Sequence, residues 1–242
     1  MTASVAALIV PVTVAAAPNP QPRLSEVLAE PSGGSYTEVQ QHSPGLLQGA
    51  FSAGDYAATG GNFGSTIKAL HDDGFIAGFG RAWVQQAPNR VLVEMVVAFT
   101  GEKGAKTWLQ QSQQADLADP TFQHSISVDG IGNYYGARMS DSSSYFAEAF
   151  LFVKGNDGFL VSTISGADDL GDSAAMQTRV QYRHAPAYTI PPDGGSIFTV
   201  ANAMAAAPLV TAGLAAGAAL TWLVTLTVRR RRKNRGYVTS GL

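Results

Sequence analysis

An uncharged apolar stretch followed by basic residues marks the C-terminal end of the sequence. No Asp, Glu, Lys or Arg occurs from Gly194 to Val228, and the last 20 of these residues, Leu209–Val228, are Leu, Val, Ala, Gly, Thr and one Trp. A helix of 20 residues spans about 30 Å, which matches the hydrocarbon core of a bilayer. We therefore predict one C-terminal transmembrane helix within residues 200–228.

Six basic residues follow this stretch within seven positions. Because positively charged flanks stay on the cytoplasmic side, we predict that residues 229–242 form a cytoplasmic tail and that the chain before Gly194 lies outside. Residues 1–228 carry 10 basic and 18 acidic residues, so the net charge of −2 hides an acidic body. The basic block adjoins the membrane span, which favours contact with lipid headgroups over nucleic acid. Its members are Arg229, Arg230, Arg231, Arg232, Lys233 and Arg235.

Export requires a signal near the N-terminus. Residues 1–17 form an apolar run with small residues before Pro18 and resemble a signal peptide, the alternative being a core strand. No basic residue precedes the run, so either the α-amino group supplies the charge or the true start lies upstream. Residues 18–35 and 187–199 are rich in Pro, Gly and Ser and are predicted to be a linker and a stalk. Residues 36–186 remain as one extracytoplasmic domain.

Short helices and strands alternate within this domain. Apolar residues at helical spacing predict helices at Ser65–Asp73, Lys103–Ala118 and from Asp172 or Ser173 to Arg183. Apolar runs bounded by turn residues predict strands at Phe75–Gln86, Arg90–Thr100, Phe122–Val128, Asn133–Met139, Tyr145–Lys154 and Phe159–Ser165. This order predicts an α+β fold, an antiparallel sheet covered by helices.

Three stretches carry a resemblance to a known family. They are GFGRAW at residues 78–83, VVAFTGEKGAKTWL at 96–109 and FLVSTIS at 159–165. Over roughly residues 62–186 the pattern resembles the PsbP-like α/β sandwich domains of secreted or membrane-anchored proteins of high-GC bacteria. The resemblance implies a binding or accessory role and transfers no functional residue. Cystatin-like and related folds fit a similar order.

The residue types present exclude several kinds of chemistry. The chain has no cysteine, so disulfides, thiolate zinc sites and thiol nucleophiles are excluded. Its histidines (His42, His71, His124 and His184) are not spaced like metal ligands. No G-x-S-x-G motif supports a triad of Ser173, His184 and an aspartate. We therefore expect a binding or accessory module of the envelope without cofactor or catalysis; the alternative is an enzyme with dispersed catalytic residues acting on an envelope substrate.

Four aromatic residues flank a polar stretch rich in Gly and Ser. Such a composition suits contact with carbohydrate or peptide, and the alternative is ordinary packing of the sheet. The four residues are Tyr134, Tyr135, Tyr145 and Phe146.

Two further groups each allow a functional and a structural interpretation. Asp168, Asp169 and Asp172 provide hard oxygen atoms for calcium, but their place before a helix favours a capping role. The run Gly60–Thr66 precedes a helix but lacks the lysine of a phosphate-binding loop, which favours a helix start.

The predicted membrane helix also offers a contact surface. Gly213 and Gly217 lie four residues apart, on one face of the helix, where two helices can approach closely. This spacing is compatible with a homodimer through the membrane helix; the alternative is a chance pair, because small residues are common throughout the span. The other expected partners are the lipid bilayer and an envelope protein, peptide or glycan.

Overall fold

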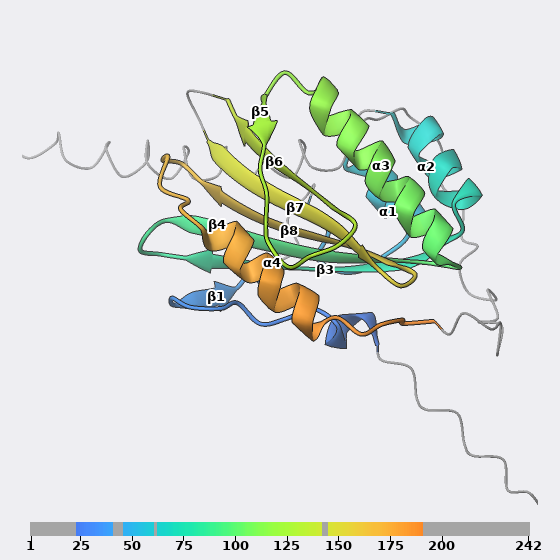
Figure 1. Ribbon diagram of the computed structural model, residues 1–242, viewed down its shortest axis with the longest axis horizontal. Coiled ribbons are helices and arrows are strands. Elements are labelled where there is room, and N and C mark those ends of the chain that lie inside the picture. Colours follow the sequence, from blue (N-terminus) through green and yellow to red (C-terminus); the bar gives the residue numbers. More distant parts are fainter. Residues whose placement is uncertain (1–22, 41–45, 61, 142–144, 191–242) are drawn as a thin grey trace, which may run out of the picture.

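The computed structural model describes residues 23–40, 46–60, 62–141 and 145–190. The helices are η1 (Leu24–Glu26, a 3-10 turn), α1 (Ala53–Ala58), α2 (Phe63–Asp72), α3 (Glu102–Ala118) and α4 (Ser173–His184). The strands are β1 (Tyr36–Glu38), β2 (Gly49–Phe51), β3 (Phe75–Gln85), β4 (Arg90–Phe99), β5 (Phe122–Ser125), β6 (Tyr134–Ser140), β7 (Phe146–Lys154) and β8 (Asp157–Ser165). The predicted α+β fold is confirmed, and Figure 1 shows α3 and α4 lying across the sheet.

All strands form one antiparallel sheet. Its order is β1-β3-β4-β8-β7-β6-β5, and β2 pairs with the remaining length of β3. Two hairpins, β3–β4 and β7–β8, form the centre, joined through β4 and β8. Gly155 makes the β7–β8 turn with a φ of 62°, a conformation that favours glycine. Likewise Gly74, with a φ of 77°, follows the C-cap residue of α2 in a conformation that favours glycine.

Helices cover both faces of the sheet because β4, at its centre, alternates two sets of apolar residues. Val93, Met95 and Val97 pack into a cluster with residues of α1, α2 and α3. Leu92 and Val96 pack on the opposite face, in a cluster with residues of α4. The alternation of side chains along β4 therefore gives the sheet two apolar faces.

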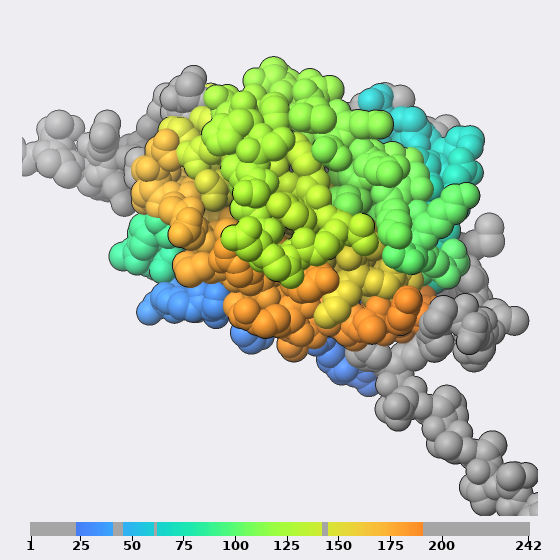
Figure 2. Space-filling model, in the orientation of Figure 1, coloured from blue at the N-terminus to red at the C-terminus, as the bar shows by residue number. Residues whose placement is uncertain are grey.

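The folded domain begins earlier than expected. Residues 23–35 belong to the segment predicted as a linker, yet Val27, Leu28 and Ala29 are at most 3% exposed. The apolar side chains of Val27 and Leu28 join the cluster on the α4 side of the sheet, which removes them from water. We call residues 24–32 the strap; Figure 2 shows this N-terminal part of the chain along the lower edge of α4.

The domain also extends beyond residue 186. Thr189, which the sequence places in the predicted stalk, is 3% exposed and hydrogen-bonded to the β7–β8 turn. The predicted signal peptide at 1–17, the membrane helix at 200–228 with Gly213 and Gly217, and the basic tail at 229–242 lie outside the described residues. Within the described ranges, no helix is long and apolar enough to cross a membrane.

Candidate functional site

The four aromatic residues of the predicted contact face do not gather on one surface. Tyr135 and Tyr145 are each 5% exposed and belong to the core on the α3 side. Tyr134 points to the other face, where its hydroxyl accepts a hydrogen bond from the Val128 amide at 3.3 Å. Phe146 is half-buried, and the Arg138 guanidinium lies 5.7 Å from its ring centre. Packing of the sheet, the alternative interpretation, accounts for these positions.

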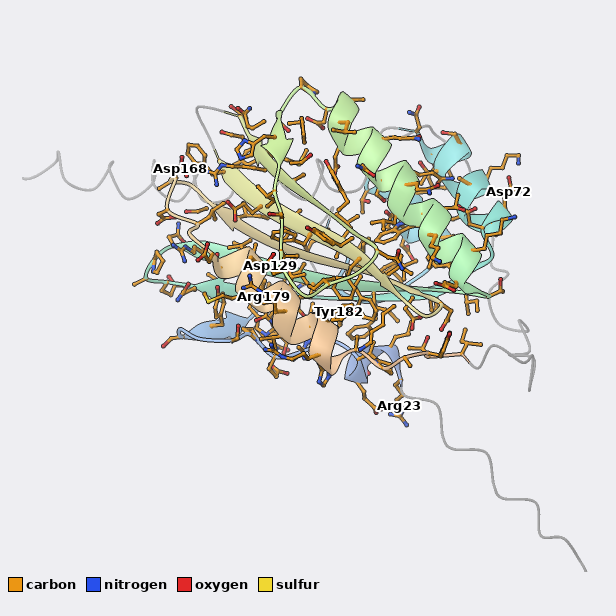
Figure 3. All side chains as sticks on the ribbon, viewed as in Figure 1. Arg23, Asp72, Asp129, Asp168, Arg179 and Tyr182 are labelled. Atoms are coloured by element: carbon orange, nitrogen blue, oxygen red, sulfur yellow. The ribbon has the colours of Figure 1, made fainter. Side chains whose placement is uncertain are left out.

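The aspartates before α4 face arginines. Asp168 forms an ion pair with Arg138, and Asp169 lies 3.6 Å from the guanidinium of Arg90. Asp172 occupies the N-cap position of α4, but its side chain makes no capping hydrogen bond. Among the described residues, no three His, Asp or Glu side chains are placed to hold a metal ion. Asp72, the last residue of α2, is also an aspartate, but Figure 3 shows it at the other end of the molecule from Asp168.

The histidines are dispersed as well. His71 is exposed on α2 and His124 on β5, while His42 lies outside the described residues. His184 ends α4, eleven residues after Ser173 at the start of the same helix. A helix rises 1.5 Å per residue, so roughly 16 Å separates the two backbones. Ser173 and His184 therefore cannot act as nucleophile and base.

A cavity lies between α1, α2 and α3, on the face of the sheet opposite α4. Its volume is about 250 Å³. The wall is formed by Tyr56 of α1, by residues of α2 and its N-cap, and by one side of α3. None of these described lining residues is charged. They are Tyr56, Asn62, Ser65, Thr66, Ala69, Leu70, Trp108, Gln111 and Ser112.

A buried hydrogen bond fixes one wall of this cavity. The indole Nε1 of Trp108 donates to the hydroxyl of Tyr56 at 2.9 Å, and Tyr56 also hydrogen-bonds with Ser112. Burial raises the pKa of Tyr56 to about 12, so its hydroxyl is neutral at physiological pH. The ring of Trp108 lies against Gly158 of β8, where a Cβ would collide with it. The sheet thus holds the indole in place from below.

A buried acid lies one helical turn beyond Ser112. Asp116 is 5% exposed, and burial raises its pKa to about 7; its Oδ2 has no hydrogen-bond partner among the described residues. Within the same part of the chain the hydroxyl of Tyr135 also lacks a partner, and burial, followed by the charge of Asp116, raises the pKa of Tyr135 to about 12. Four polar groups, from Tyr56, Ser112, Asp116 and Tyr135, thus extend from the cavity into the core beneath α3.

The cavity offers hydroxyl and amide groups beside aromatic rings and lacks a fixed charge. This set suits a neutral ligand that both donates and accepts hydrogen bonds. The sequence contains two partial signals of it. Asn62, Ser65 and Thr66 belong to the Gly60–Thr66 run, in which the structure places Asn62 at the N-cap of α2 and the other two inside that helix. Gln111 belongs to the glutamine-rich side of α3. Their convergence depends on the packing of three helices, which the sequence pattern does not reveal.

Comparison with solved structures finds a likeness of fold at low sequence identity. No family model and no curated protein matches the sequence. Among solved structures, the extracellular domain of PknH from Mycobacterium tuberculosis is similar, with a TM-score of 0.41 and 15% sequence identity. The alignment covers 66% of this chain and 95% of that chain. No family match accompanies the PsbP-like resemblance, which remains one of strand and helix order.

Proposed function

We propose that this chain is a membrane-anchored binding module of the cell envelope that holds a neutral, hydroxyl-bearing group in the cavity between α1, α2 and α3. The lining supports this proposal, because Asn62, Thr66 and Gln111 supply amide and hydroxyl groups next to the aromatic Trp108. The cavity has a volume of about 250 Å³, which is below the roughly 300–1,000 Å³ typical of pockets for drug-sized ligands. A single sugar ring of an envelope glycan fits this size and chemistry.

The proposed role is binding without turnover. An activated nucleophile needs a base within hydrogen-bond reach. The cavity contains hydroxyls at Ser65, Thr66 and Ser112, and its described lining includes no histidine, carboxylate or lysine. Asp116 lies one turn of α3 away from Ser112 and is not part of the lining. The neutral hydroxyls therefore serve as hydrogen-bonding groups in this proposal.

The ligand-binding part of the proposal is tested with the full-length protein in lipid nanodiscs. Neutral monosaccharides and N-acetylated sugars are titrated while the melting temperature is recorded, with sugar phosphates for comparison. We expect neutral sugars to raise the melting temperature of the wild type and to lose most of this effect in Thr66→Val. Thr107→Val, a matched change on α3 outside the lining, should retain the effect. Equal losses in both variants, no response to neutral sugars, or chemical conversion of the bound sugar would contradict the proposal.

The topology is tested separately by cysteine labelling, since the chain has no cysteine of its own. Gln114→Cys places a thiol on the exposed side of α3, and Ser240→Cys places one in the predicted tail. A membrane-impermeant maleimide added to intact cells should label the first variant, and the second only after lysis. Labelling in the reverse order would show that the domain lies in the cytosol.

A further inference from the structure

The strap is held along α4 through its main chain. The side-chain amide of Gln181 makes two hydrogen bonds to it: its Oε1 accepts from the Ala29 amide at 2.6 Å, and its Nε2 donates to the Val27 carbonyl at 2.7 Å. Both groups of Gln181 are therefore used, as in a short piece of sheet.

Gln177 repeats this arrangement one turn earlier in α4. Its Oε1 accepts from the Ser32 amide at 2.7 Å, and its Nε2 donates to the Glu30 carbonyl at 3.2 Å. At the other end of the helix, Nε2 of His184 lies 3.0 Å from the Glu26 carbonyl. The three α4 residues are spaced i, i+4 and i+7, so one face of the helix binds the whole strap.

The same amide of Gln177 also contacts a buried acid of the sheet. Its Nε2 donates to Oε1 of Glu94 at 2.6 Å. Glu94, on β4, is 0% exposed, and its Oε2 has no hydrogen-bond partner among the residues that the structure describes. One side chain thus joins the strap to a carboxyl group that has no access to water.

The charged groups around Glu94 come from β3 and from the strap. Arg81 of β3 lies directly opposite Glu94 in the sheet and forms ion pairs with Glu30 of the strap at 2.7 Å and with Glu38 of β1 at 2.8 Å. The residue of α4 that faces Glu94 is the neutral Gln177. On β8, the residue paired with Glu94 in the sheet is the apolar Val161. Arg81 can therefore give up its ion pair with Glu30 of the strap and form one with Glu94 instead.

Burial makes the closed strap favour the protonated form of Glu94. It raises the pKa of Glu94 from 4.5 to about 8, against the opposing effects of Gln177, Arg81 and the Ala29 amide; the charge of Glu30 adds to the rise. Once the strap leaves, water reaches the carboxyl group and its pKa returns toward the ordinary value. The closed state thus loses stability as pH rises from about 4.5 to about 8 and no further above that.

We propose that the strap is a pH-dependent cover that leaves the α4 face when Glu94 loses its proton to solvent, with Arg81 exchanging Glu30 for Glu94. Gly33 and Gly34 follow the strap directly and have φ values of 74° and 68°. These conformations suit glycine and provide a hinge, so the strap can turn away without moving β1. Release uncovers the apolar groove that Val27 and Leu28 fill. This device is independent of the sugar cavity on the other face of the sheet.

Amide hydrogen exchange of the full-length protein tests this proposal. Because the pKa of Glu94 is raised in the closed state, the opening equilibrium should rise between pH 6 and pH 8, by at most about 50-fold when the pKa of the open state returns fully to 4.5. After correction for the intrinsic exchange rate, protection at Ala29 and Ser32 should fall over this range in the wild type, by up to that factor. In Glu94→Gln, which keeps an acceptor for Gln177, protection should not change with pH. Amides of β8 report opening of the whole domain and should not follow the strap.

Three outcomes would overturn the proposal. The first is that protection of the wild-type strap does not change between pH 6 and pH 8. The second is that strap protection falls equally in Glu94→Gln, and the third is that protection of the β8 amides falls in parallel with that of the strap. If Glu94→Gln does not fold, Glu30→Gln provides the test, because it removes the carboxylate that competes for Arg81. The strap of this variant should already be less protected at pH 6; protection equal to wild type at both pH values would exclude the exchange.

Discussion

Thr189 is tied to Asp157 by two hydrogen bonds that close the folded domain. The hydroxyl of Thr189 donates to Asp157 Oδ1 at 2.5 Å, and its backbone amide lies 3.2 Å from Oδ2. The neighbouring Asn156 adds a contact through its Oδ1, 3.2 Å from the same amide. Lys154, at the end of β7, donates to the carbonyls of Tyr182 and Ala185 and so holds the end of α4. Side chains of one hairpin turn thus fix the last described residues.

Thr189→Val should destabilise the domain most at neutral and alkaline pH. Burial raises the pKa of Asp157 to about 6, and the bonds from Thr189 oppose this rise by favouring the charged form. Without the hydroxyl, ionised Asp157 is left with fewer donors, at a cost of about 1–3 kcal/mol. Chemical denaturation should show a smaller loss at pH 4.5, where the carboxyl group is protonated. Thr37→Val on exposed β1 is the matched control, and an equal loss at both pH values would contradict the assignment.

Asp116→Asn should flatten the pH dependence of stability. With a pKa of about 7 in the fold and 3.8 ordinarily, Asp116 ionises first in the unfolded chain, so wild-type stability falls as pH rises through this window. Relative to the wild type, the free energy of unfolding of the variant should increase by at most about 1.4 kcal/mol per pH unit, up to about pH 7. Denaturation series at pH 4, 5.5 and 7 measure this difference. Asp129→Asn, on an exposed loop, should show no such trend.

Gly158→Ala should disturb α3 as well as the sheet. A Cβ at this position would meet the ring of Trp108, which is itself 3% exposed and cannot move aside. Overpacking of this kind costs about 1–3 kcal/mol or more. The melting temperature should fall, with a change in indole fluorescence. Gly132→Ala provides the control, because nothing lies within 4 Å of a Cβ there; equal effects of the two changes would contradict the packing.

Tyr56→Phe should leave the Trp108 indole without its acceptor. The lost hydroxyl strands a buried N–H group, and we expect a destabilisation of about 1–3 kcal/mol. Thermal and chemical denaturation measure it. Tyr188→Phe removes a hydroxyl from a side chain that is 44% exposed and should be close to neutral. A neutral result for Tyr56→Phe would mean that water replaces the tyrosine as acceptor.

The long elements were predictable because their patterns are long. Ten residues of β4 alternate between two buried faces, and the Gly155–Gly158 sequence marks the hairpin turn after β7. The three-residue strands β1 and β2 and the six-residue α1 are too short to show a period.

The strap and the cavity were missed for different reasons. The flanking Pro and Gly residues of the strap indicated a linker, although the three apolar residues Val27, Leu28 and Ala29 lie between them. The cavity joins Tyr56 to Ser112, residues far apart in sequence that only tertiary packing brings together. Glu94, an acid within an apolar strand, was the one visible sign of a buried polar network.

The two ends of the described chain leave the domain from one pole. Glu26 meets His184 at the end of α4, and Thr189 is bound at the start of β8; Figure 3 shows Arg23 beyond this end of the helix. The β3–β4 turn lies at the other pole, because Ser165, the last residue of β8, pairs with Arg90 and contacts Asn89. The β3–β4 turn thus lies opposite both ends of the described chain, so a molecule bound at this tip would cover neither end.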